Sequence, residues 1–243
     1  MLALLNKELS NFFSSIIGYI VIIIFLLITS LFLWAFPNDF NILNFGYAQI
    51  DGLFLIAPYV FLFLIPAISM RSFADENKSG TIEILLTKPI SDLNIIFAKF
   101  GANFILLLIA IIPTLTYYFS VYYLGFPVGN IDSGGVFGSY IGLLFLGAVF
   151  ISIGLFASSL TSNQIVAFII AVFLSGFIFI GFEFIYQISW LGNASLVIKS
   201  LGIYDHYTSI SRGVIDTRDI LYFLGVISLF ISLTKLSLQS RNW

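Results

Sequence analysis

Residues 71–99 of the 243-residue chain read RSFADENKSGTIEILLTKPISDLNIIFAK. This stretch concentrates charge in a protein whose charged content is only 9%. Its four basic and four acidic residues are Arg71, Lys78, Lys88, Lys99, Asp75, Glu76, Glu83 and Asp92. The flanking segments are largely apolar, so we expect this stretch to be a polar loop between two membrane-spanning helices.

The composition is that of a polytopic membrane protein. Hydrophobic residues make up 60% of the chain and aromatic residues 18%, outside the usual range of soluble domains. The net charge is −2 and the basic residues are scattered, which argues against a nucleic-acid partner. Because there is no cysteine, disulfides and thiolate chemistry are excluded. No stretch is left for a soluble catalytic domain, so we predict no enzyme activity, no catalytic residues and no metal site.

The apolar runs predict an all-α membrane protein with six spanning helices in a single domain, residues 1–243. The predicted spans are residues 16–36, 52–70, 100–123, 137–160, 165–185 and 220–238. Residues 1–15 have apolar side chains at helical spacing and predict an amphipathic interfacial helix. A signal peptide is the alternative, but the following apolar run is too long for one. Residues 187–219 are expected to form short helices on the outer side.

The distribution of Lys and Arg predicts the orientation. With the N-terminus inside, the inner side carries seven: Lys7, Arg71, Lys78, Lys88, Lys99, Lys235 and Arg241. The outer side carries three: Lys199, Arg212 and Arg218. We therefore expect both termini and residues 71–99 to face the cytoplasm.

Within residues 71–99 the sequence indicates a helix, a hinge and a second, shorter helix. Gly80 can end the first helix in a left-handed conformation. Ser79 or Thr81 can begin the second helix, and Glu83 in its first turn suits the positive end of the helix dipole.

The short second helix has one apolar face and a clear end. Ile82, Leu85 and Leu86 fall at positions i, i+3 and i+4, and Pro89 stops the helix. Such a helix can lie on lipid or bind a groove on another protein. Because its acids and bases cancel the attraction of an anionic leaflet, we favour a protein partner.

These residues resemble a known family. The run ENKSGTIEILLTKPIS, residues 76–91, resembles the loop between the second and third spans of ABC-2 type transporter permeases. The six spans, the Lys7-Glu8-Leu9 run in the first helix, and Ser211-Arg212-Gly213-Val214-Ile215-Asp216 before the last span resemble the same family. Within that family the chain is most similar to permease subunits of gliding-motility transporters of Bacteroidota.

The resemblance implies a role for the loop and a set of partners. The implied ATPase-coupling residues are Gly80, Thr81, Ile82, Glu83, Leu85, Leu86 and Pro89, with Lys7 and Glu8 beside them. A separate ABC ATPase would bind ATP and magnesium, since this chain has no P-loop and no cofactor of its own. A second permease half, a different subunit or an identical one, completes the unit in the lipid bilayer of the bacterial cytoplasmic membrane.

The outer side offers further candidates. Glu183 is an acid well inside an apolar run, which suggests either a structural role at the interface or a place in an outward cavity. Arg212 and Asp216 are four residues apart and can pair on one helical face. With Gly213 they lie in a segment that, by resemblance, forms an external lid. His206 is expected to be structural, since one histidine without companions is a poor metal site.

Two glycines also stand out in the fourth span. Gly138 and Gly142 have the GxxxG spacing that lets helices approach closely, either inside the chain or between subunits.

The sequence therefore predicts the membrane subunit of an ATP-driven exporter that couples hydrolysis to transport or conformational work. A membrane anchor or scaffold that transports nothing is the alternative. An ion channel fits poorly, because no span carries rings of charge or a filter sequence.

Overall fold

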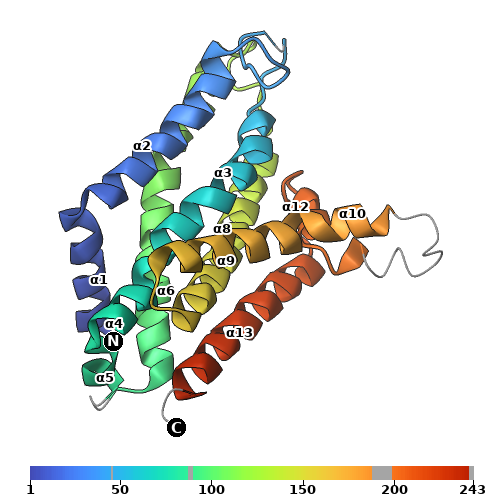
Figure 1. Cartoon of the computed structure of the whole chain (residues 1–243). Helices are drawn as coiled ribbons and strands as arrows, with labels where there is room; N and C mark the ends of the chain where they lie inside the picture. Colours follow the sequence, from blue (N-terminus) through green and yellow to red (C-terminus); the bar gives the residue numbers. More distant parts are fainter. Residues whose placement is uncertain (45, 87–89, 188–198, 241–243) are drawn as a thin grey trace.

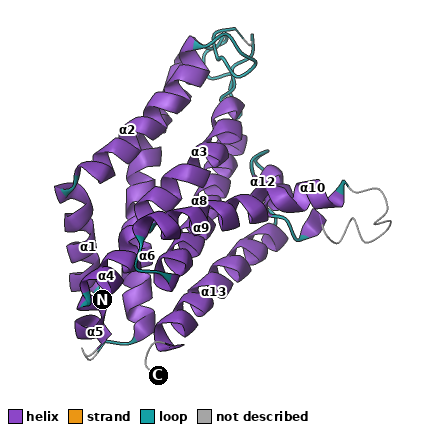
Figure 2. Ribbon diagram, in the orientation of Figure 1, coloured by secondary structure: helices purple, strands orange, loops and turns teal. Residues whose placement is uncertain are grey.

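The computed structural model describes residues 1–44, 46–86, 90–187 and 199–240. These residues are helical apart from connecting loops and contain no strand, which confirms the all-α prediction (Figure 2). Within these described residues, six helices are long and apolar enough to cross a membrane. The N-terminus and the end of the last helix lie at the same end of the bundle, as an even number of spans requires (Figure 1).

The helices follow the predicted order. The first half consists of α1 (Leu2–Ser14), α2 (Ile16–Ser30) with the π-helical segment Leu31–Ala35, α3 (Asp51–Ser69), α4 (Arg71–Ser79) and α5 (Thr81–Leu86). The middle consists of α6 (Asp92–Ile111), the 3₁₀ turn Ile112–Thr114, α7 (Leu115–Leu124) and α8 (Ser133–Leu160). The last part consists of α9 (Gln164–Gly176), the π-helical segment Phe177–Gly181, α10 (Phe182–Tyr186), α12 (Ile203–Ile210) and α13 (Thr217–Gln239).

Each predicted span overlaps one of the six continuous helical stretches, and several of these stretches extend beyond the span. The third runs from Asp92 rather than from residue 100, and the fourth from Ser133 rather than from residue 137. Side-chain caps hold these added turns: Ser91 accepts a hydrogen bond from Asn94 N, and Asp132 accepts one from Gly135 N. Hydropathy marks only the apolar part of a helix, so the polar capped turns were not predicted as part of the spans.

Helix α8 is the centre of the bundle. It packs against α3, α6, α9 and α13, and most of its surface is buried. Close contact depends on its small residues, since a Cβ on Gly154 would lie 1.9 Å from the Ser69 hydroxyl of α3. By contrast, α2, α9 and α13 lie at the periphery and expose large apolar side chains. Such surfaces suit contact with lipid or with another membrane subunit.

The amphipathic helix α1 packs on the bundle instead of standing alone. Leu4, Glu8 and Phe12 form a buried stripe at spacing i, i+4 and i+8, and the helix lies along α6. The chain then bends at Ser15, which has extended backbone angles, and enters α2. The predicted helix is confirmed, while its placement in a membrane interface stays a prediction.

Helix α12 closes the end of the bundle opposite to α5. Its buried residues Ile203, Tyr207 and Ile210 pack toward α8, and the Tyr207 hydroxyl donates a hydrogen bond of 2.6 Å to the carbonyl of Phe54. Burial raises the pKa of Tyr207, so its hydroxyl remains a donor.

The small residues of α8 make internal contacts at this end. A Cβ on Gly142 would lie 2.8 Å from the Ile210 side chain. A Cβ on Gly138 would lie 2.9 Å from the backbone of Gly213. Of the two roles expected for the GxxxG spacing, the structure supports packing within the chain.

We expect Gly138→Ala to destabilise the protein by about 1–3 kcal/mol, because the new methyl group would lie only 2.9 Å from the backbone of Gly213. Gly225→Ala in α13 is the matched control, since a Cβ there has no neighbour within 4 Å and alanine favours a helix. The measurement is the thermal unfolding midpoint of both purified variants. Equal midpoints for the two variants would show that a methyl group fits at Gly138 without strain.

Candidate functional site

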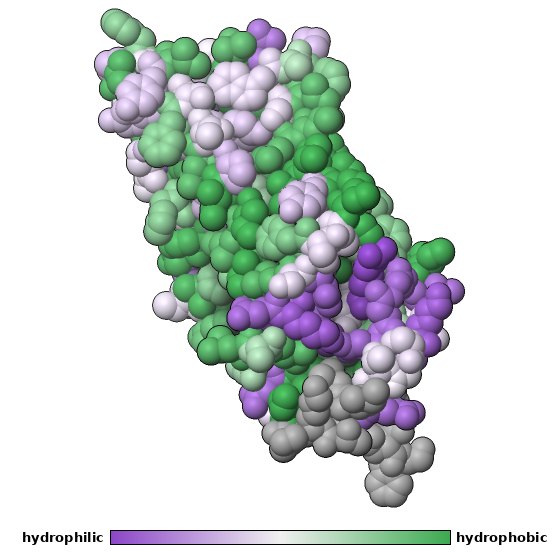
Figure 3. All heavy atoms as spheres, turned by 90° about the vertical axis from the view of Figure 1, so that its left-hand side faces the viewer, coloured by the Kyte–Doolittle hydropathy of each residue, from purple (hydrophilic) through white to green (hydrophobic). Residues whose placement is uncertain are grey.

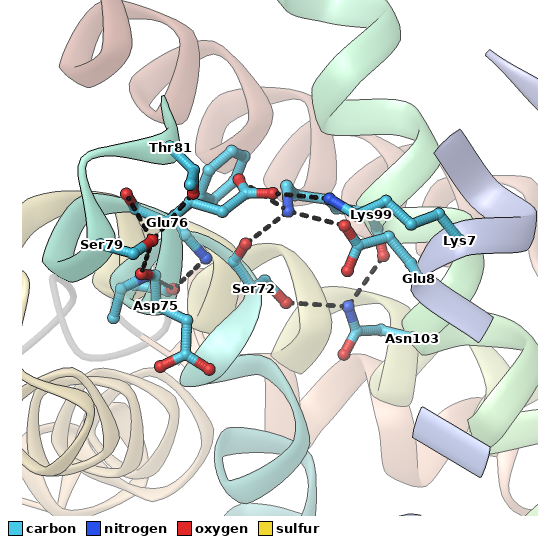
Figure 4. Close-up of polar contacts among 12 residues, drawn as sticks. Lys7, Glu8, Ser72, Asp75, Glu76, Ser79, Thr81, Lys99 and Asn103 are labelled. Carbon is cyan, nitrogen blue, oxygen red and sulfur yellow. Dashed lines mark hydrogen bonds and ion pairs between the residues drawn. The ribbon is translucent and has the colours of Figure 1, made fainter. Parts of the chain in front are cut away.

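The candidate site lies at the end of the bundle where α1, α4, α5 and the first turns of α6 meet, which we call the charged end. A cavity of about 370 Å³ opens there between α1 and α4. Its lining includes Lys7, Glu8, Glu76, Thr81 and Lys99 (Figure 4). The structure thus brings the predicted residues Lys7 and Glu8 beside the polar loop.

Helix α4 is held in place by the central helix α8. The Ser158 hydroxyl of α8 accepts hydrogen bonds from Phe73 N at 2.8 Å and Ala74 N at 3.1 Å. It also lies 3.1 Å from the carbonyl of Met70 and donates to it. These backbone groups sit where α3 ends and α4 begins, so one serine side chain caps α4 from a neighbouring helix.

A buried lysine joins three helices behind this cap. Lys99 of α6 is 1% exposed, and its Nζ lies 3.0 Å from Glu8 Oε1 of α1 and 3.0 Å from Glu76 Oε2 of α4. It also donates a 2.5 Å hydrogen bond to the carbonyl of Ser72. Asn103, one turn further along α6, donates to the Ser72 hydroxyl at 3.1 Å. Figure 4 shows these side chains converging between the helices.

The need to neutralise a buried ammonium group explains why acids and a carbonyl group surround Lys99. A buried ammonium ion is costly unless carboxylates and hydrogen-bond acceptors surround it, and Lys99 has both. Two carboxylates around one lysine leave one excess negative charge. Lys7, whose side chain is 57% exposed, lies 3.7 Å from Glu76 Oε1 and offsets that charge. Removing any member of the cluster therefore leaves an unbalanced charge at the junction of α1, α4 and α6.

The hinge and the short helix of the loop are confirmed. Gly80 has φ +71°, the left-handed conformation that ends α4, and α5 follows at once. The hydroxyls of Ser79 and Thr81 lie 2.8 Å apart across the turn.

The predicted coupling residues of α5 differ in their exposure to solvent. Thr81 and Glu83 are exposed, whereas Ile82 is buried among the residues of this chain and anchors α5 to the bundle. Ile82 is therefore not part of the exposed surface that we predicted for α5. Leu85 and Leu86 belong to α5, and Pro89 lies outside the described residues. A role of α5 in binding a partner stays a prediction.

The outer candidates surround a second cavity, of about 730 Å³, at the opposite end. Glu183, Arg212 and Asp216 all line it. Lys199 pairs there with Asp205 at 3.1 Å, and this carboxylate raises the pKa of Lys199. A lid function at this end stays a prediction.

The expected helical pairing of Arg212 with Asp216 is wrong. Helix α12 ends at Ile210, and Asp216 is the N-cap of α13, so the two residues share no helix. Gly213 has φ +82° between them, and a Cβ there would lie 2.3 Å from Gly135 Cα. This glycine turns the chain where α12 meets α8, which a spacing rule for helices does not take into account.

His206 has a structural environment. Its Nδ1 lies 2.7 Å from Asp219 Oδ1, its Nε2 lies 2.9 Å from the carbonyl of Ser200, and its ring stacks on Tyr222. In the described part of the chain, no group of three or more metal-binding side chains occurs.

The buried cluster is the part of the site that sequence reasoning missed. Lys99 was counted with the polar loop, but it lies inside the bundle. A usable signal was present: Lys99 and Asn103 are four residues apart in an apolar helix, so they share one face and need buried polar partners. The partners themselves are distant in sequence and could not be identified from spacing.

Comparison with known proteins agrees with this architecture. A family model described as "ABC-2 family transporter protein" matches residues 2–240. None of the curated proteins compared with the chain matches it.

We expect Lys99→Met to destabilise the protein by about 3–5 kcal/mol, because Glu8 and Glu76 would be left buried without their cation. Adding Glu8→Gln and Glu76→Gln to the same chain should recover part of the loss. The exposed Lys78 of α4 provides the control variant Lys78→Met. Thermal midpoints are the measurement, and equal midpoints for the two single variants would contradict the role of the cluster.

Proposed function

This chain belongs to the ABC-2 family of transporter proteins, and we propose that it receives the work of ATP hydrolysis from a separate subunit at α5. It is a transmembrane permease subunit of an ABC transporter. In the proposed mechanism the ATPase binds ATP with Mg²⁺, since the sequence of this chain has no P-loop. The energy then reaches the spans through contact between two proteins.

The observation that carries the proposal is the connection of α5 to the bundle. Helix α5 follows α4 directly through Gly80, and α4 is tied to α1 and α6 by Lys99. A push on the exposed surface of α5 would therefore move a rigid group of three helices. Because α4 continues α3 and α6 is the start of the third span, that movement would reach the membrane-spanning part.

A second permease half would complete the pathway. The chain supplies six spans, and its peripheral helices α2 and α9 expose apolar side chains that include Ile23, Ile169 and Phe173. These faces support assembly with another membrane subunit, identical or different. The complex would act in the bacterial cytoplasmic membrane with the charged end in the cytoplasm.

The resemblance of the chain to gliding-motility permeases supports a narrower role. We propose that the complex serves gliding motility, by export or by conformational work on the envelope. Deleting the gene in a gliding bacterium should abolish spreading on agar, and the wild-type gene should restore it. Normal spreading of the deletion strain would contradict this narrower role while leaving the transporter role intact.

For the ATPase contact we expect Glu83→Arg, or Leu85→Asp, to abolish co-purification with the ATPase subunit while membrane insertion is unchanged. Glu83 is exposed on α5, so replacing it changes the contact surface and not the core. Asp39→Arg is the matched control, an exposed acid in the loop after α2 at the opposite end of the bundle. If both α5 variants retain the ATPase as the control does, α5 is not the docking element.

A further inference from the structure

We propose that the cavity at the charged end binds the headgroup of one zwitterionic phospholipid with a primary amine, of the phosphatidylethanolamine type. The site lies between α1 and α4 and includes Lys7, Glu8 and Thr81, which the family resemblance places at or beside the ATPase contact; the lipid proposal does not rest on that contact. Four features carry the proposal: the level of the cavity, an unpaired guanidinium nitrogen, the balance of charge, and the apolar surface next to it.

The cavity lies where the chain leaves its apolar segments. Ser15 and Ile17 line it at the bend between the amphipathic helix α1 and the span α2. Arg71 lines it directly after the apolar helix α3. Both boundaries separate a spanning segment from a polar one, which is the level at which lipid headgroups lie.

Two cations of the lining are available for a phosphate group. Arg71 Nε is buried and has no hydrogen-bond partner among the residues that the structure describes. Buried guanidinium nitrogens are normally paired, so this atom marks a place for an acceptor. Lys7 is exposed, and its 3.7 Å contact with Glu76 is a long one. A phosphate oxygen is a strong acceptor for both side chains.

The charge balance selects a zwitterion over an anionic lipid. The cavity is lined by three cations, Lys7, Arg71 and Lys99, and three acids, Glu8, Asp75 and Glu76. A lining with no net charge gives no general attraction to anionic headgroups. It does offer separate partners for a phosphate and for an ammonium. A primary ammonium can donate a hydrogen bond to Asp75, whose Oδ1 also accepts one from the Gln164 amide, whereas a choline group has no N–H to donate.

The surroundings suit the acyl chains of such a lipid. Phe12 and Ile17 form an apolar part of the lining, and Ile16, Ile20 and Ile23 are exposed along α2. Figure 3, which faces the α1 and α2 side, shows hydrophilic side chains gathered below a broad hydrophobic surface. A headgroup in the cavity would thus leave its chains beside α2. A water-soluble phosphate compound would make no use of this apolar surface.

The test compares lipids on the purified full chain in detergent. Added phosphatidylethanolamine should raise the thermal midpoint by several degrees and remain bound as one molecule per chain in native mass spectrometry. Phosphatidylcholine, phosphatidylglycerol, glycerophosphoethanolamine and inorganic phosphate should each give a much smaller shift. Arg71→Gln should weaken phosphatidylethanolamine binding roughly tenfold or more, as expected for loss of a charge-assisted hydrogen bond.

Two further variants keep the result interpretable. Lys7→Gln removes only the long, solvent-exposed contact of the cluster, so it should lower the thermal midpoint far less than Lys99→Met and still weaken binding if Arg71→Gln fails to fold. Lys78→Gln, an exposed lysine of α4 that does not line the cavity, should bind as the wild type does. Equal stabilisation of all variants by every lipid would indicate general lipid contact and overturn the proposal. Stronger binding of phosphatidylglycerol, or of either soluble phosphate compound, would also overturn it.

Discussion

The structure depends on one buried ammonium ion. Lys99 is 1% exposed, and the free-energy cost of burying its ammonium group is offset because Glu8, Glu76 and the carbonyl of Ser72 surround it. These partners come from α1 and α4, so the need to neutralise one charge fixes the position of two helices on α6. Apolar contact alone would allow these helices to slide, whereas an ion pair with a definite geometry does not. The N-terminal helix is thereby part of the bundle and not a separate appendage.

Helix α8 supplies the second constraint. Its small residues let α3 and α12 approach its backbone, and its Ser158 hydroxyl caps the first turn of α4. The same helix therefore touches the charged end through Ser158 and the opposite end through Gly138. A displacement of α4 has to break or carry along the Ser158 hydrogen bonds. Helix α8 therefore connects the charged end with the opposite end of the bundle.

The sequence predicted most of the fold for physical reasons that can be named. Each span requires about 20 apolar residues, so the six apolar runs identified the six helices. Gly80 marked the correct position for a helix end, because a left-handed backbone has a local sequence requirement. The burial of Ile82 was not predicted, since its spacing with Leu85 and Leu86 fits a face toward any neighbour. Lys99 with Glu8 and Glu76 was also missed, because pairs more than 20 residues apart leave no periodic signal.

We propose that α1, α4 and α6 move as one group when α5 is pushed. The chain has no cysteine, so pairs of spin labels can be introduced at exposed sites without other changes. Labels at Ser10 and Lys78 report the distance between α1 and α4, and labels at Lys78 and Asp39 report the distance between the two ends. In the complex with its ATPase, we expect ATP to leave the Ser10 to Lys78 distance unchanged and to alter the Lys78 to Asp39 distance. A change in the Ser10 to Lys78 distance, or no change in either, would contradict the proposal.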